Sequence, residues 1–308
     1  MLKVVNLSIE YQREKEVLQN LSFTLAAGEH LCIMGKSGSG KTTLLKALYG
    51  LLDVKTGTIS WKGQEVLGPS FHLIPGAKFF KYVAQDFDLM PFTSVSENIG
   101  EFLSRFYPKE KEQRTQELLE VIEMTDFSNK KIIHLSGGQQ QRVAIARALA
   151  KEPELILLDE PFGQIDNLRK KILKRKLFTY LKEKEISCIL ATHDGNDALS
   201  FSDHMMVLEN QQVVARGTPE NIYKDPVRLS VASLFDDANE VVVEGRALLL
   251  YPHQIKIVEK SPYKSVVSKS YFKGGYWLVE ATFNSQIIFF QSIEKFLPKK
   301  EVFLSFTK

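Results

Sequence analysis

The stretch "GKSGSGKTT", residues 35–43, sets the tightest limit on the fold of this chain. The apolar run "HLCIMG" precedes it, and leucines recur at helical spacing from Thr42 to Leu52, so a strand runs into a glycine-rich loop and then into a helix. The loop fits the pattern Gly, any four residues, Gly-Lys-Thr, from Gly35 to Thr42. Backbone N–H groups of such a loop wrap phosphates at the positive end of the helix, which predicts a phosphate-binding α/β fold.

The side chains of this loop are expected to divide the work of binding. Lys41 reaches the outer phosphates, and the Thr42 hydroxyl is placed to ligate magnesium. The residues that we expect to contact the nucleotide here are Gly35, Lys36, Ser37, Gly38, Ser39, Gly40, Lys41, Thr42 and Thr43.

The apolar run "LILLDEP" supplies a partner for the loop. It reads as a strand that ends at Asp159 and Glu160, and ligands of parallel sheets bind at the carboxyl ends of the strands. Alone, such an acidic pair is typical of a surface turn; beside a phosphate loop it predicts Asp159 as a magnesium ligand and Glu160 as the base that deprotonates a water. His193, which ends the next apolar run "ATHD", is predicted to hydrogen-bond the terminal phosphate and that water.

A second glycine-rich segment, "LSGGQQQRVAIARAL" at 135–149, also leads into a helix, from about Gln139. Ser136, Gly137 and Gly138 therefore form another anion site at a helix N-terminus. A charged helical stretch, 97–127, lies between the two loops and opens with a capping box of Ser94 and Glu97. The simplest arrangement is a second copy facing the other way, so that each segment closes over the nucleotide held by its partner.

The rest of the chain indicates two domains. Strands and helices alternate as far as about residue 235, which predicts a parallel sheet with a helical insertion at about 90–135. In the basic helix near 168–185 we expect an apolar inner face and a solvated basic outer face; the inner residues are Ile172, Leu173, Leu177 and Phe178, and the outer ones Lys170, Lys171, Lys174, Arg175 and Lys176. Residues 236–308 carry short apolar runs between turns, which predicts a small all-β domain with a tight hairpin at "KGGYW", 273–277.

Composition restricts the partners. The 308 residues carry 40 basic and 37 acidic side chains, a net charge of +3, which gives no support to nucleic-acid binding. The two cysteines, Cys32 and Cys188, lie in apolar runs and are expected to be buried and unreactive. The first residues lack the features of a signal peptide, and no run approaches the roughly 18 apolar residues of a membrane span, so we expect another chain to cross any membrane involved.

Taken together, these motifs resemble the ATP-binding subunit of an ABC transporter, a P-loop NTPase, over about residues 2–235. The resemblance implies that Tyr11 stacks on adenine, that Gln85 in "YVAQDF" links magnesium to the transmembrane partner, and that Gln139 and Asp166 belong to the ATP site. From the residues alone, Tyr11 is equally a half-exposed strand residue and Gln85 a polar strand end. "GQID", 163–166, departs from the family's usual Ser-Ala-Leu-Asp at Gln164, which affects the expected coupling between the two sites but not ATP binding.

The segments "RGTPENIYKDP", "VASLFDDANEV" and "LLLYPHQIKIV" resemble the junction and start of the OB-like (TOBE) regulatory domain of importers for ferric iron, polyamines, sulfate and related solutes. Its aromatic residues are candidates for a ligand-stacking face, but a small barrel needs such residues as filling, so we expect them in the core. They are Tyr271, Phe272, Tyr276 and Trp277.

The resemblance implies an ATP- and Mg²⁺-dependent ATPase of an importer. We expect it to act as a homodimer or pseudo-dimer with transmembrane permease subunits, indirectly with an extracytoplasmic solute-binding protein, and without nucleic acid. It would lie at the cytoplasmic side of the cell (inner) membrane as a peripheral subunit. An exporter ATPase, a non-transport ABC ATPase and a purely regulatory binding module are the alternatives. A single ATP cassette without sustained heptads disfavours the second, and a full set of catalytic residues disfavours the third.

Overall fold

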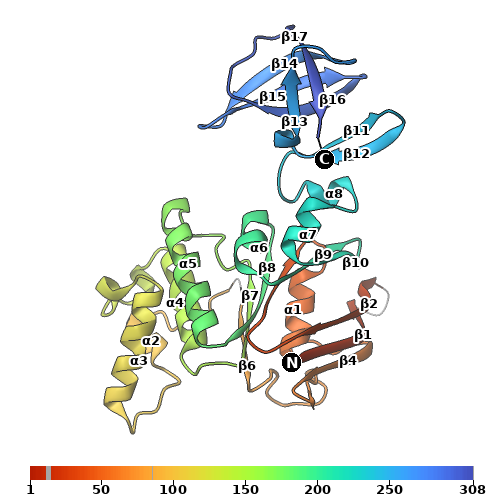
Figure 1. Ribbon diagram of the computed structural model, residues 1–308. Coiled ribbons are helices and arrows are strands. Elements are labelled where there is room, and N and C mark those ends of the chain that lie inside the picture. The colour runs from red at the N-terminus through yellow and green to blue at the C-terminus, as the bar shows by residue number, and fades with distance from the viewer. Residues whose placement is uncertain (12–14, 85, 308) are drawn as a thin grey trace. The chain divides into compact units, whose positions relative to one another are not determined.

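The computed structural model describes residues 1–11, 15–84 and 86–307. The chain divides into two compact units, 1–219 and 220–308, which are described separately here (Figure 1). The domain boundary expected at 235/236 stays a prediction.

The centre of the first unit is a six-stranded sheet in the order β10-β9-β3-β8-β7-β6. Five strands run parallel, and β10 is an antiparallel edge strand. The strands are β3 (His30–Met34), β6 (Phe80–Val83), β7 (Leu155–Asp159), β8 (Ser187–Thr192), β9 (His204–Glu209) and β10 (Gln212–Gly217). Every residue of β3, β7 and β8 is buried, as continuous apolar runs in a parallel sheet predict, so the parallel sheet is confirmed.

A four-stranded antiparallel sheet, β2-β1-β4-β5, shares one core with the parallel sheet. Its strands are β1 (Leu2–Tyr11), β2 (Lys15–Leu25), β4 (Thr56–Trp61) and β5 (Gln64–Glu65). The run "GTISWKGQEV" forms both β4 and β5, because Lys62 and Gly63 take positive φ angles of 49° and 84° in the turn between them. Helix α1 (Lys41–Tyr49) contributes Leu44, Leu45 and Leu48 to the core that the two sheets share, which fixes the loop before it.

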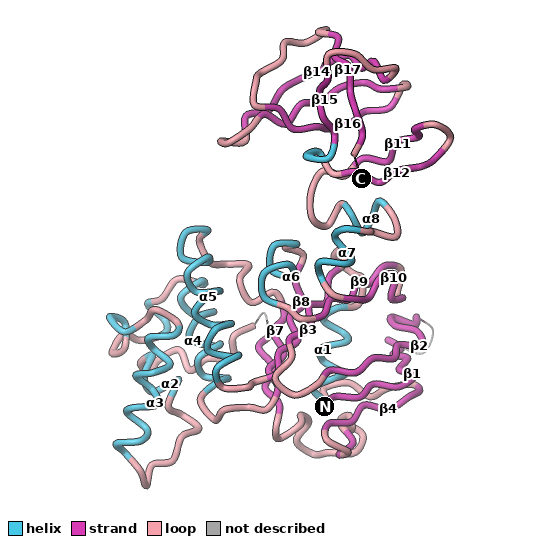
Figure 2. The backbone as a smooth tube through the Cα atoms, viewed as in Figure 1, coloured by secondary structure: helices cyan, strands magenta, loops and turns pink. Residues whose placement is uncertain are grey.

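The remaining helices of this unit begin and end as follows: α2 (Val95–Ile99), α3 (Pro108–Val121), α4 (Gly137–Leu149), α5 (Asn167–Glu183) and α6 (Gly195–Phe201). Figure 2 shows these helices together on one side of the parallel sheet. The capping box of Ser94 and Glu97 is confirmed at the start of α2. The stretch expected to be helical throughout, 97–127, is interrupted between α2 and α3 and ends in a short 3₁₀ turn, Thr125–Phe127.

Helix α5 corrects two predictions about its faces. Ile172, expected to point inward, is 44% exposed, whereas Lys174, expected on the solvated face, is only 6% exposed. Lys174 stands four residues before Phe178, so helical spacing places it on the inward stripe. The two cysteines are buried and free as expected, and burial raises the pKa of both thiols.

The second unit is mainly antiparallel. Its short helices are α7 (Pro219–Lys224) and α8 (Leu229–Ala232), followed by the hairpin β11 (Asn239–Val243) and β12 (Arg246–Leu250). A five-stranded sheet has the order β13-β17-β14-β15-β16, with β13 (Ile255–Val258), β14 (Tyr263–Phe272), β15 (Trp277–Phe283), β16 (Gln286–Ser292) and β17 (Glu301–Phe306). The hairpin expected at "KGGYW" is confirmed between β14 and β15, where the Lys273 N–H donates to the Tyr276 carbonyl. The unit is consistent with the predicted OB-like domain.

The aromatic residues of this hairpin bear out part of the expectation that they lie in the core. Trp277 is half-buried and packs against the core, and Tyr271 and Tyr276 are half-buried as well, but Phe272 is not in the core. Phe272 is 65% exposed and its ring contacts that of Trp277, with centroids 5.0 Å apart. The buried interior is built instead from aliphatic side chains with Phe283, Phe290 and Phe296. Phe272 pairs with Trp277 at the very end of the two strands, so its ring lies at the edge of the packed interior.

Candidate functional site

The phosphate loop connects β3 to α1. Gly40 caps α1 with a φ of 102°, and a Cβ there would lie 3.0–3.1 Å from Leu18 and the Val17 carbonyl, so this turn requires glycine. Lys41 is buried, with 8% of its surface exposed. Its ammonium donates to the Gly35 carbonyl at 2.8 Å and to the Lys36 carbonyl at 3.3 Å. The lysine is thus held within its own loop at a helix N-terminus, where an anion is stabilised.

A cavity of about 360 Å³ opens in front of this loop. It brings the loop together with the two strand ends that sequence reasoning singled out; the lining residues are Val17, Ser37, Gly38, Gly40, Lys41, Thr42, Thr43, Asp159, Glu160 and His193. All of the strand-end residues come from the carboxyl ends of β7 and β8, where parallel sheets bind their ligands.

Asp159, the last residue of β7, is 1% exposed. Its Oδ2 accepts a hydrogen bond from the Tyr82 hydroxyl at 3.1 Å, whereas its Oδ1 has no hydrogen-bond partner among the residues that the structure describes. Burial, together with the charge of Asp159, raises the pKa of Tyr82, which therefore stays a neutral donor. An unpaired, buried carboxylate oxygen in a cavity that Thr42 also lines suits a hard cation such as Mg²⁺.

Glu160 and His193 meet across the cavity. The His193 Nδ1 lies 2.9 Å from the Glu160 Oε2. Glu160 has a φ of 48°, an unusual conformation for a residue other than glycine, while its N–H donates to the Ala191 carbonyl at 3.0 Å. The sheet therefore holds the Glu160 backbone and directs its carboxylate to the imidazole and the phosphate loop.

The second glycine-rich segment forms the start of α4. Ser136 caps the helix through a capping box with Gln139 and is exposed. A Cβ on Gly138 would lie 2.6 Å from the Gln164 carbonyl oxygen, and one on Gly137 would lie 2.2 Å from the Gln164 side-chain oxygen. Residues 164 and 165 of the same chain thus pass directly over both glycines. None of the described residues 135–139 lines the cavity in front of the phosphate loop.

Gln141 is a residue that sequence reasoning missed. It is 3% exposed, its Nε2 donates to the Glu160 carbonyl at 3.2 Å, and its Oε1 accepts from the Gln164 N–H at 3.3 Å. The second glycine-rich helix is thereby bonded to the backbone of Glu160. The signal in the sequence was the spacing: Gln141 stands four residues before the apolar Ile145, which places it on the inward stripe of α4.

Three other predicted residues are placed less completely. Gln85 and the side chain of Tyr11 lie outside the described residues, although the Tyr11 backbone ends β1. Asp166 caps α5, accepting the Arg169 N–H at 3.1 Å. Asp166, which we expect at the ATP site, therefore also fixes the start of α5.

The segment after β6 is tied to α4 by Arg147. This side chain donates to the Asp88 carbonyl and to the Glu101 carboxylate, and its guanidinium lies 5.0 Å from the Phe102 ring centroid. Four aromatic side chains between residues 92 and 107 are exposed: Phe92, Phe102, Phe106 and Tyr107. Arg147 thus joins Asp88, Glu101 and Phe102 to the helix that is capped by Ser136.

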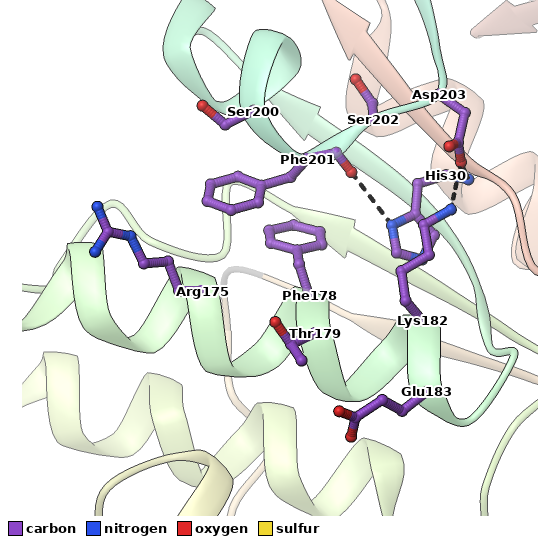
Figure 3. A pocket seen from close by; sticks show the side chains of 10 residues that line it. All are labelled: His30, Arg175, Phe178, Thr179, Lys182, Glu183, Ser200, Phe201, Ser202 and Asp203. Carbon is purple, nitrogen blue, oxygen red and sulfur yellow. Dashed lines mark hydrogen bonds and ion pairs between the residues drawn. The ribbon is translucent and has the colours of Figure 1, made fainter.

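A second cavity, of about 450 Å³, lies between α5 and the end of α6 (Figure 3). The rings of Phe178 and Phe201 stack there with centroids 4.6 Å apart, beside His30. Burial lowers the pKa of His30, helped by the charge of Lys182, so the imidazole is neutral. Because His30 begins β3, this cavity lies at the amino end of that strand, away from the strand ends that carry Asp159 and Glu160.

Among the described residues, no helix is long and apolar enough to cross a membrane, and no cluster of three or more His, Cys, Asp or Glu side chains forms a metal site. A magnesium ion bound by a threonine, one aspartate and phosphates does not require such a cluster.

Comparison with known proteins places these features in a family. The family model described as "ABC transporter" matches residues 18–163. The chain is 35% identical over 240 residues to the Fe(3+) ions import ATP-binding protein FbpC of Haemophilus influenzae (strain 86-028NP), covering 77% of this chain and 68% of that protein. It is 32% identical to the spermidine/putrescine import ATP-binding protein PotA of Clostridium novyi (strain NT), covering 88% of each chain.

A third relative is the molybdate/tungstate import ATP-binding protein WtpC of Pyrococcus horikoshii (strain ATCC 700860 / DSM 12428 / JCM 9974 / NBRC 100139 / OT-3), with 36% identity, 80% of this chain and 71% of that protein. Among solved structures, the dimeric ATP-binding cassette MJ0796 in a post-hydrolysis state with ADP and Pi superposes with a TM-score of 0.63 and 29% identity, covering 71% of this chain and 99% of that one.

Proposed function

This chain belongs to the family of ABC transporter ATP-binding proteins, and from that premise we propose that it is the ATPase subunit of an importer. Its substrate is ATP, bound in the cavity that the phosphate loop shares with Asp159, Glu160 and His193. The importer assignment is supported by the names of its relatives, which import ferric ions, polyamines, and molybdate or tungstate.

Each residue of the cavity has a separate part in the proposed reaction. The loop N–H groups and Lys41 hold the outer phosphates and neutralise charge that develops as the terminal phosphoryl group departs. Glu160 accepts a proton from the attacking water, and His193, 2.9 Å from that carboxylate, donates a hydrogen bond to the terminal phosphate. Tyr11 is proposed to stack on the adenine ring.

The donor set fits a magnesium ion, as the unpaired buried Oδ1 of Asp159 indicates. Thr42, Asp159 and Gln85 would hold it, and when bound it supplies charge neutralisation at the phosphates.

The assembled site is proposed to need two subunits. Ser136, Gly137 and Gly138 form the start of α4, where Ser136 is exposed and the helix terminus favours an anion. A homodimer related by a two-fold axis would place this terminus, with Gln139 and Asp166, on the nucleotide held by the partner. Dimeric solved structures of similar cassettes support this arrangement.

The exposed aromatic surface of Phe102, Phe106 and Tyr107 is proposed to receive the transmembrane permease subunits. Arg147 links this surface to α4, so opening and closing of the dimer would move it. The protein would then act at the cytoplasmic side of the membrane as a peripheral subunit, with a solute-binding protein acting on the far side.

The single observation that carries the proposal is the separation of the two anion sites within one chain: the cavity has the lysine and the carboxylates, and the second glycine-rich segment stays outside it. A complementation experiment tests it. Lys41→Met should disable the first site, and Ser136→Asp should disable the second, because aspartate keeps the helix cap but repels phosphate.

Equal amounts of the two inactive variants should regain about a quarter of the wild-type ATPase rate, since half of the randomly mixed dimers contain one intact composite site. Ser136→Asn, which caps without charge, is the matched control and should stay active. Failure of the mixture to regain activity, with both variants folded, would reject the two-subunit site.

A further inference from the structure

Lys174 is a buried charged residue that the proposed reaction does not use. It lies in the second turn of α5, and its side chain is 7% exposed. Its ammonium donates to the Asp194 Oδ2 at 3.1 Å and, in a shorter contact, to the Asp197 Oδ1. It also lies 5.1 Å from the centroid of the Phe162 ring.

These contacts belong to the two segments that carry the reacting side chains. Phe162 follows Glu160 by two residues, and Asp194 follows His193 directly. One ammonium group thus contacts the segment after the proposed base and the segment after the proposed imidazole. The two side chains themselves meet at 2.9 Å, so their relative position depends on both segments.

The Asp194 segment is held by further hydrogen bonds. The Asp194 Oδ1 accepts the Asn196 N–H at 3.1 Å as the cap of α6, and the Asp194 N–H donates to the Thr192 hydroxyl at 3.1 Å. That hydroxyl donates to the Asp197 Oδ2 at 3.4 Å. Each carboxylate therefore uses one oxygen for the turn after β8 and the other for Lys174.

The charges at this cluster agree with the geometry. Burial raises the pKa of the Asp194 carboxyl, but the hydrogen bond and charge of Lys174 outweigh it and lower the pKa below its usual value. Burial raises the pKa of Asp197, which Lys174 only partly offsets. Of the two carboxylates that share Lys174, Asp194 is therefore the one held in the ionised form, so removing either Lys174 or the Asp194 charge should break the ion pair.

We propose that Lys174 is a positioning residue for ATP hydrolysis, bracing the His193 turn and the Glu160 turn against α5 so that the imidazole and the carboxylate stay aligned. The proposal rests on the ATPase function proposed above. Because Asp166, the cap of α5, directly follows the residues that cover Gly137 and Gly138, the brace also connects the second glycine-rich segment to His193 of the same chain.

The first test uses Asp194→Asn in the full-length protein. Asparagine still caps α6 but loses the ion pair with Lys174. We expect kcat to fall about tenfold or more, as misplaced catalytic groups do, while the KM for ATP changes less than about twofold. Lys174→Met should behave likewise, and Lys174→Arg, which keeps charge and donors, should restore about half of the wild-type kcat or more.

Lys171→Met is the matched control, because Lys171 is exposed and lies one turn earlier on α5. Its kcat should equal that of the wild type. Melting temperatures of all variants show which remain folded, and Asp194→Asn keeps the test available where Lys174→Met unfolds.

The second test separates alignment from general support of the fold. In a His193→Ala background, Asp194→Asn should lower the residual single-turnover rate no further, because the group that it positions is gone. An equal loss in both backgrounds would overturn the proposal.

A wild-type kcat for Asp194→Asn, with His193→Ala strongly impaired, would overturn the proposal while leaving the ATPase assignment intact. A wild-type kcat for His193→Ala would instead reject the proposed role of His193, and the brace with it.

Discussion

The helix N-termini of α1 and α4 both offer donors to an anion, but they are built in opposite ways. The α1 terminus lies behind a loop whose lysine is 8% exposed and faces carboxylates from two strands. The α4 terminus is exposed at Ser136 and capped by its own Ser136 and Gln139, and its two glycines pack against residues 164 and 165. The first is a pocket lined by residues of one chain, whereas the second is the surface over which we propose that a second subunit closes.

This difference predicts where substitutions cause large losses. We propose that the side chains of the first pocket act on the reacting atoms, so their removal should affect ATP binding or hydrolysis directly. We propose that the α4 terminus acts through backbone donors, so side-chain changes there should act mainly through packing.

The largest effect is expected for Glu160→Gln. Glutamine cannot accept the proton of the attacking water, so kcat should fall by about 10²–10⁴-fold. ATP should still bind, and an ATP-bound dimer should accumulate on size-exclusion chromatography. Retained turnover in this variant would reject Glu160 as the base.

Lys41→Met should be the next largest. It keeps the apolar stem but removes the ammonium from the phosphates, so kcat/KM for ATP should fall by about 10²–10³-fold or more. Equilibrium nucleotide binding should weaken as well, unlike in Glu160→Gln. Normal ATP affinity in a folded Lys41→Met protein would show that the cavity is not the phosphate site.

Gly138→Ala and Gly137→Ala form a matched pair at the second terminus. The methyl group at 138 would lie 2.6 Å from a backbone carbonyl that cannot yield, whereas at 137 it meets the flexible end of Gln164. We expect Gly138→Ala to lower the free energy of unfolding by about 1–3 kcal/mol and Gly137→Ala by less than about 1 kcal/mol. Urea unfolding measures both, and equal values would contradict the packing difference.

Gln164→Ala should have the smallest effect. The side chain is exposed and its carboxamide forms no described hydrogen bond, so removing it leaves the backbone cover over Gly138 in place. The ATPase rate should change by less than about threefold. A larger change would mean that the departure from the family's alanine tunes the second site through its side chain.

Much of the site at the N-terminus of α1 is predictable from the sequence. The loop is one continuous segment, and Asp159 and Glu160 follow an apolar run, so strand direction alone brings them to the same edge of the sheet. The resemblance to ABC ATP-binding proteins then supplied the fold, which the comparisons confirm.

The residues that sequence reasoning missed are those whose role depends on contacts between distant segments. Gln141 looks like another glutamine in a polar run, and Lys174 like another lysine in a basic helix, until the packing of α4 and α5 shows both to be buried. The charge pattern hid the burial of Lys174, because it is one of five basic residues in 170–176 that together suggested one solvated face. The prediction for Phe272 was wrong for the opposite reason: an aromatic side chain suggested burial, whereas its place at the end of two paired strands leaves it exposed.

The backbone of residue 164 passing over Gly138 also bears on how related sequences are compared. A descendant that had lost its ATPase activity would still need glycine at 138 for the two segments to pack. Conservation of that glycine therefore indicates a shared fold and does not indicate that a related protein still hydrolyses ATP. Substitution of Glu160 or His193, whose side chains line the cavity, is the change that we expect in a relative that has lost ATPase activity.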